Sequence, residues 1–172
     1  IYVATDELKK GLTEALLAAV LDPQLAPAHS AIGMICLAEG DLDRAAKEFS
    51  QAIKLAPELV SAHTGLGVVY AEKGELAKAL KTQKAAVALN SKSAAVHNNI
   101  GCIYTAQGKL DQAIKEFEEA LQLQPGWGLP YGNLAIAYLD MNRFAEAVKA
   151  AEKAVQLGEE SAILRTTLAR VY

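Results

Sequence analysis

The three histidines of this 172-residue chain are the first residues whose type and spacing could do chemistry. They are His29, His63 and His97, so each follows the previous one after 34 residues. Three imidazoles are a familiar ligand set for zinc, but the rings must converge within about 2 Å of one ion. Whether they can converge depends on the elements that carry them.

Cys36 and Cys102 are the other side chains with distinctive reactivity. Two cysteines are too few for a disulfide framework, and they have no CxxC spacing. No Ser-His-Asp set, glycine-rich phosphate loop or Cys-His pair occurs in the context that its chemistry requires. We therefore predict that the protein is not an enzyme, with no catalytic residue, no metal and no cofactor.

A second series of residues repeats with the same step as the histidines. Gly40, Gly74 and Gly108 are also 34 residues apart, which indicates an internal repeat. Counting from Ala26, four full units span residues 26–59, 60–93, 94–127 and 128–161. Within a unit, apolar residues recur every three or four positions, the pattern of a helix. Glycine between two such runs supplies the left-handed conformation that ends a helix. Each unit is thus predicted to be a helical hairpin.

The repeated positions resemble those of the tetratricopeptide (TPR) family. Residues of the third unit that carry the resemblance are Ile100, Gly101, Tyr104, Gly108, Ala113, Phe117, Ala120 and Pro125. The second unit departs at Gln83 and Ser91, where phenylalanine and proline are usual, and the fourth has Ala151 for phenylalanine and no closing proline. The resemblance implies an all-α fold, a right-handed TPR solenoid of stacked antiparallel helical hairpins.

The two ends of the chain are interpreted as parts of further units. Residues 1–25 match the end of a first helix plus a second helix, and residues 162–172 match the first helix of a further repeat or a capping helix. We expect the chain to be a piece of a longer array. A reducing compartment suits its two cysteines, and a cytoplasmic location is predicted.

The repeat geometry argues against a metal site. Equivalent residues of neighbouring units are expected to lie about 9–10 Å apart, too far for shared coordination. The histidine position normally holds an aromatic residue that packs between helices, and Tyr131 takes it in the fourth unit. The histidines are therefore predicted to be packing residues. Cys36 and Cys102 are two units apart, roughly 20 Å, so no disulfide is expected between them.

The resemblance also implies which residues face the concave surface of the solenoid, namely those on the first helix of each unit. The predicted partner-binding residues are Met34, Leu37, Thr64, Val68, Asn98, Asn99, Cys102, Asn133, Ile136, Leu139 and Arg170. Asn99 and Asn133 are at equivalent positions and could bind a peptide backbone, or could be solvated or bonded within the helices. The apolar members could hold an amphipathic helix, or another part of the superhelix could cover them.

Composition narrows the class of partner. A net charge of −3 and a pI near 5.7 give no general attraction to nucleic acid. The longest apolar run, Ala15 to Leu21, is seven residues, so no membrane span is predicted. Ala95, Leu129 and Ile163 stand where the TPR proteins that grip acidic chaperone tails have lysine.

The leading hypothesis is a non-catalytic scaffold that binds a partner peptide or helix in the concave groove. Two alternatives stay open. One is a targeting or regulatory module of a larger enzyme. The other is an assembly scaffold that self-associates through exposed solenoid ends.

Overall fold

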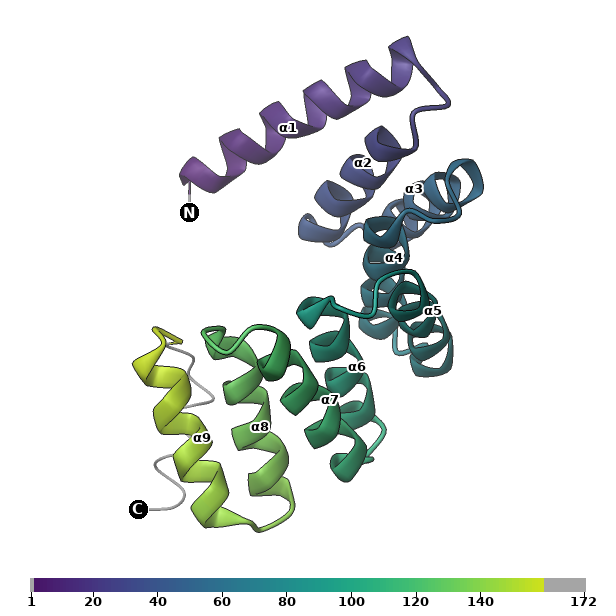
Figure 1. Cartoon of the computed structure of the whole chain (residues 1–172). Coiled ribbons are helices and arrows are strands. Elements are labelled where there is room, and N and C mark those ends of the chain that lie inside the picture. Colours follow the sequence, from purple (N-terminus) through teal and green to yellow (C-terminus); the bar gives the residue numbers. More distant parts are fainter. Residues whose placement is uncertain (1, 160–172) are drawn as a thin grey trace. The chain divides into compact units, whose positions relative to one another are not determined.

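The structure is a computed structural model, and it describes residues 2–159 as a succession of helices joined by short turns (Figure 1). The nine helices of this part are α1 (Tyr2–Leu21), α2 (Ala26–Ala38), α3 (Leu42–Leu55), α4 (Val60–Glu72), α5 (Leu76–Leu89), α6 (Ala94–Ala106), α7 (Leu110–Leu123), α8 (Gly128–Asp140) and α9 (Phe144–Gln156). Residues 2–159 contain no strand. None of these helices is long and apolar enough to cross a membrane.

Four helical hairpins account for most of the packing. They are α2 with α3, α4 with α5, α6 with α7, and α8 with α9. Helices α2, α4, α6 and α8 each begin at the first residue of a predicted repeat unit. The chain divides into two compact units, residues 1–90 with α1 to α5 and residues 91–172 with α6 to α9. We call these the N-terminal and C-terminal units.

The turn within each hairpin depends on one residue with positive φ. Gly40, Gly74 and Gly108 have φ of 80°, 74° and 71°, and Asn142 has φ of 58° at the same place in the fourth hairpin. This conformation lets the amide just after the positive-φ residue bond back into the last turn, as Lys109 N does to the Tyr104 carbonyl at 2.9 Å. The glycine and asparagine series therefore sets the spacing of the hairpins.

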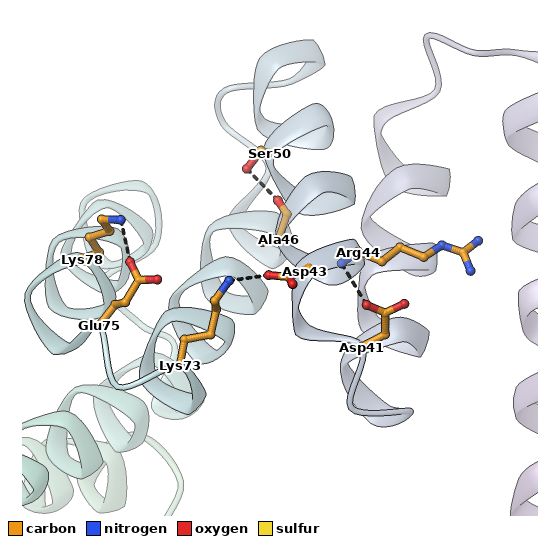
Figure 2. A network of polar contacts seen from close by, with 8 residues as sticks. All are labelled: Asp41, Asp43, Arg44, Ala46, Ser50, Lys73, Glu75 and Lys78. Atoms are coloured by element: carbon orange, nitrogen blue, oxygen red, sulfur yellow. Dashed lines mark hydrogen bonds and ion pairs between the residues drawn. The ribbon is translucent and has the colours of Figure 1, made fainter.

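Polar contacts tie the turns of the first two hairpins together (Figure 2). Asp41 caps α3 by accepting a hydrogen bond from the Arg44 amide at 3.1 Å. Lys73, just past the end of α4, pairs with Asp43 on α3 at 2.5 Å. The hydrogen bond from Lys73 holds the pKa of Asp43 below its usual value. Because both groups lie at the surface, the pair contributes little to the stability of the fold.

Close contact between glycine and phenylalanine forms the centre of the first and third hairpins. Phe49 is fully buried, and a Cβ added to Gly33 or Gly65 would lie 2.9 or 2.2 Å from its ring. Gly101 is equally close to Phe117, where an added Cβ would lie 2.4 Å from the ring. Glycine is thus required because the aromatic ring occupies the space of its side chain.

The N-terminal segment differs from its predicted form. Residues 2–21 are one uninterrupted helix, α1, and not the end of a first helix followed by a second. The turn expected from the repeat would centre on Asp6, where the other units have glycine or asparagine. Aspartate adopts positive φ less readily, so the helix continues through this position. The predicted last helix, residues 162–172, lies outside the described residues.

Candidate functional site

The predicted concave face follows the first helices of the hairpins, and its part in each unit is called the N-terminal or the C-terminal groove below. The N-terminal groove is formed by α2 and α4, which contact each other directly, and the C-terminal groove by α6 and α8, which also do. Most of the predicted partner-binding residues lie on these four helices. Each groove is described within its own unit.

The N-terminal groove exposes mainly apolar side chains. Met34 on α2 is 52% exposed, and Leu37 and Val68 are half-buried. Thr64 is also half-buried, and its hydroxyl donates to the Val60 carbonyl at 2.9 Å, which leaves its methyl group for contact. The available surface is therefore a thioether with aliphatic neighbours, a combination that adapts to apolar partners.

One polar residue of this region is used within the fold. Ser30 on α2 is 5% exposed, and its hydroxyl is 3.1 Å from that of Ser61 on α4. This hydrogen bond joins the two helices that form the N-terminal groove. Ser30 therefore holds α2 and α4 together and is not available to a partner.

The C-terminal groove contains a hollow of about 250 Å³ between α6 and α8. Its lining is Cys102, Thr105, Ala106, Phe117, Asn133 and Ile136. Three of these, Cys102, Asn133 and Ile136, belong to the predicted partner-binding set. Thr105 turns its hydroxyl inward to the Gly101 carbonyl at 3.0 Å, which leaves a largely apolar cavity wall.

The asparagines of the C-terminal groove play different roles. Asn98 is 3% exposed and accepts a hydrogen bond from Asn133 Nδ2 at 2.9 Å. The same Nδ2 lies 3.4 Å from Cys102 Sγ. Asn133 is thus bonded across the two helices through its amide hydrogens. Asn99 is half-buried, and its side chain forms no hydrogen bond with any residue in the described range 2–159.

Cys102 and Cys36 occupy different surroundings. Cys36 is buried in the core of the first hairpin, where desolvation raises the pKa of its thiol. Cys102 has an exposed surface, yet it lies at the bottom of the hollow with protein on most sides. Desolvation there raises the pKa of Cys102 to about 11. Its sulfur is therefore a neutral, weakly polar contact at neutral pH.

Among the predicted site residues that the structure describes, Asn98 and Leu139 are buried and are not part of the exposed groove surface. Leu139 on α8 is 7% exposed and belongs to the core, so it is not available to a partner. Its position lies at the edge of the helix face that bears Asn133 and Ile136, about a quarter turn from the centre of that face. Arg170 lies outside the described residues.

The histidines connect each of the first three hairpins to the loop before it. The Nε2–H groups of His29, His63 and His97 donate to the carbonyl six residues earlier, at 3.2, 2.7 and 3.3 Å. In two hairpins Nδ1 faces a carboxylate of the second helix, with His29 and Glu48 2.8 Å apart and His97 and Glu116 2.8 Å apart. Within residues 2–159, no group of three or more His, Cys, Asp or Glu is placed to hold a metal ion.

A second hollow, not predicted from the sequence, lies between α8 and α9. Its volume is about 550 Å³. It is lined by Tyr131, Leu134, Tyr138, Glu146, Lys149, Ala150, Glu152, Lys153 and Gln156. One sequence feature could have indicated this hollow: Ala150 is at the position where the first and third repeats have glutamate.

Comparison with known families identifies the class of protein. Family models described as tetratricopeptide repeat match residues 30–94 and residues 92–160. With the hairpins and their turn residues, these matches establish that the chain belongs to the TPR family and confirm the predicted all-α TPR solenoid. A search of curated protein sequences found no match.

Several solved structures have the same fold. A thermophilic TPR protein of Thermus thermophilus is 24% identical, with 99% of this chain and 93% of that one covered and a TM-score of 0.82. PilF of Pseudomonas aeruginosa is 19% identical, covering 99% and 78%, with a TM-score of 0.85. YrrB, described as a TPR protein with an unusual peptide-binding site, is 21% identical, covering 97% and 86%, with a TM-score of 0.73. At these identities the likeness concerns the fold.

Proposed function

We propose that the protein is a non-catalytic scaffold that binds a peptide or helix of a partner protein in its concave grooves. TPR repeats commonly act as protein-protein interaction modules. The observation that carries the proposal is the hollow between α6 and α8, because it presents apolar walls beside a small set of polar groups. Such a combination suits a side chain of a bound peptide.

The groove chemistry indicates how a partner would be held. Met34, Leu37 and Val68 offer apolar contacts, and Ile136 does so in the C-terminal unit. The side-chain amide of Asn99 is available to a peptide backbone, whereas Asn133 offers its carbonyl oxygen. With no charged side chain among these contacts, affinity should change little between low and moderate salt.

A peptide library provides the test. Peptides selected against the immobilised chain should lose about tenfold or more in affinity when Ile136→Glu places a charge in the hollow. Gln112→Glu on α7 adds the same charge at an exposed position and serves as the control. The proposal fails if the selected peptides bind the Ile136→Glu protein and the control equally well, with both proteins folded.

Self-association is a second candidate, favoured by the outer face of α1. Leu16 is 37% exposed and Val20 is 75% exposed. At the positions equivalent to Leu16, the helices α3, α5, α7 and α9 have the polar residues Ser50, Lys84, Glu118 and Glu152, all of them exposed. The apolar face is therefore specific to α1 and is not required by the repeat, which suits contact with a second copy of the chain.

Light scattering over a range of concentrations tests this candidate. Self-association through α1 predicts a mass that rises with concentration and returns to about 18.2 kDa in the Leu16→Lys/Val20→Lys variant. Ser50→Lys/Ala88→Lys, at exposed positions of α3 and α5 equivalent to Leu16 and Val20, adds the same charge as the matched control and should not change the mass. A constant monomer mass for the unmodified chain would exclude this candidate.

A further inference from the structure

The fourth hairpin lacks an interaction that the first and third share. In those two hairpins a histidine on the first helix faces a glutamate on the second, as His97 faces Glu116 at 2.8 Å. The equivalent residues of the fourth hairpin are Tyr131 and Ala150. A methyl group cannot extend to the ring as a glutamate does. The space beside the ring therefore stays open, and the hollow of about 550 Å³ is found there.

This hollow is separate from the concave groove. Its α8 residues are Tyr131, Leu134 and Tyr138, whereas Asn133 and Ile136 line the groove. At about 100° per residue, the two sets point to opposite sides of the helix. A ligand in one hollow would therefore leave the other accessible.

The floor of the hollow is suited to an aromatic ring. Tyr131 and Tyr138 are about two turns apart on the same helix, with Leu134 between them. Arg143 stacks on the Tyr138 ring, with its guanidinium carbon 4.5 Å from the ring centre. Two tyrosine rings and an aliphatic side chain offer edge and face contacts that a phenylalanine or tyrosine of a partner could use.

The rim of the hollow has two unpaired cations. Glu146 is paired with Arg143, with Nη2 and Oε1 2.9 Å apart, and hydrogen bonding from Arg143 lowers the pKa of Glu146. Lys149 and Lys153 lie one turn apart on α9 and form no ion pair with any residue of the described range. Glu152 is the remaining carboxylate of the rim. Glu118 on α7 is a further carboxylate close to the floor of the hollow, and after burial its interaction with the Tyr138 hydroxyl contributes to a raised pKa of that tyrosine. On the α9 side of the hollow, Lys149 and Lys153 outnumber Glu152, and this local excess of positive charge favours an anionic ligand.

We propose that the hollow between α8 and α9 binds an acidic segment of a partner protein, which inserts an aromatic side chain between Tyr131 and Tyr138. Carboxylates flanking that aromatic residue lie against Lys149 and Lys153. The site goes beyond the concave groove because it lies on the opposite side of α8. Since exposed charges contribute to it, binding weakens as the salt concentration rises.

The test is an NMR titration with the ¹⁵N-labelled chain and two peptides. The acidic probe is acetyl-GFEEG-amide and its matched counterpart is acetyl-GFKKG-amide. We expect saturable shifts of the amides of Tyr131, Ala150 and Lys153 with the acidic peptide, and about tenfold weaker binding of the basic one. Absence of these shifts, or equal binding of the two peptides, would overturn the proposal.

The variant Tyr131→His/Ala150→Glu introduces the pair that the first and third hairpins use. It should fill the hollow and abolish the shifts, whereas Ala145→Glu, an equal charge at an exposed position of α9, should preserve them. If the double variant does not fold, Lys149→Gln/Lys153→Gln provides the same test by removing the preference for the acidic peptide. Ile136→Glu in the concave groove should leave this titration unchanged, so the two proposals can fail separately.

Discussion

At the scale of single residues, the position of a residue in the repeat predicted which element carries its side chain. It did not predict the hydrogen-bond partners of that side chain. The spacing of the three histidines predicted that they lie too far apart to bind one metal ion. It could not indicate that two of them face a glutamate. Asn99 and Asn133 are equivalent in the repeat, yet only Asn133 is bonded across to Asn98. Such pairings depend on which residue the neighbouring helix supplies, and a pattern within one repeat does not contain that information.

Cys102 should react slowly with alkylating reagents although it is exposed. Its pKa of about 11 compares with 9.0 for an ordinary cysteine, so the thiolate at pH 8 is about 100-fold less abundant. Alkylation by iodoacetamide, followed by peptide mapping, should be slower by that factor than in urea-unfolded protein and should accelerate as the pH rises toward 11. An equal rate in folded and unfolded protein would show that the thiol is not desolvated.

Gln83 is a buried polar residue in the second hairpin, and its replacement by leucine should not weaken the fold. The side chain is fully buried, Nε2 donates to the Thr64 carbonyl at 3.1 Å, and Oε1 has no partner among the described residues. Leucine has a similar volume and leaves no unsatisfied oxygen, so Gln83→Leu should raise the free energy of unfolding by about 1 kcal/mol. Urea denaturation measures this. A loss of similar size would indicate that Oε1 does have a partner in solution.

At the scale of the helical elements, the sequence predicted most of the fold because single residues decide the turns. Glycine or asparagine with positive φ ends the first helix of every hairpin from α2 to α9, and each was recognisable in the repeat. The prediction of an interrupted helix in residues 1–25 was wrong, because Asp6 takes the place of the turn residue. The hollow between α8 and α9 was not predicted, because it arises where Ala150 differs from the repeat pattern and not where the sequence follows it.

Packing between α6 and α7 depends on the pairing of Gly101 with Phe117. Gly101→Ala places a methyl group 2.4 Å from the ring and should cost about 1–3 kcal/mol of unfolding free energy. In the background Phe117→Ala the ring is absent, so the same change should cost little or should stabilise. The fourth hairpin already has alanine at both positions, Ala135 and Ala151. Urea denaturation of the four proteins gives the coupling energy, and additive effects would contradict this account.

At the scale of the whole molecule, the chain has several exposed surfaces that differ in composition. The concave grooves present Met34, Val68 and Ile136, the opposite side of α8 has the tyrosine-lined hollow, and α1 exposes Leu16 and Val20. The repeat explains the concave grooves, because equivalent residues of neighbouring first helices lie side by side within a unit. The other two are departures from the repeat. Differences between the repeats are therefore the best guide to what distinguishes this TPR protein from others.

The central claim is that the concave grooves bind a partner peptide, and methyl NMR tests it most directly. Addition of a library-selected peptide to the methyl-labelled chain should shift the methyl signals of Met34, Val68 and Ile136. The signals of Val20 on α1 and Val155 on α9 should stay in place, because both side chains are exposed and neither belongs to the predicted groove residues. Shifts confined to Val20, Val155 or the hollow between α8 and α9, with the groove signals unchanged, would contradict the claim.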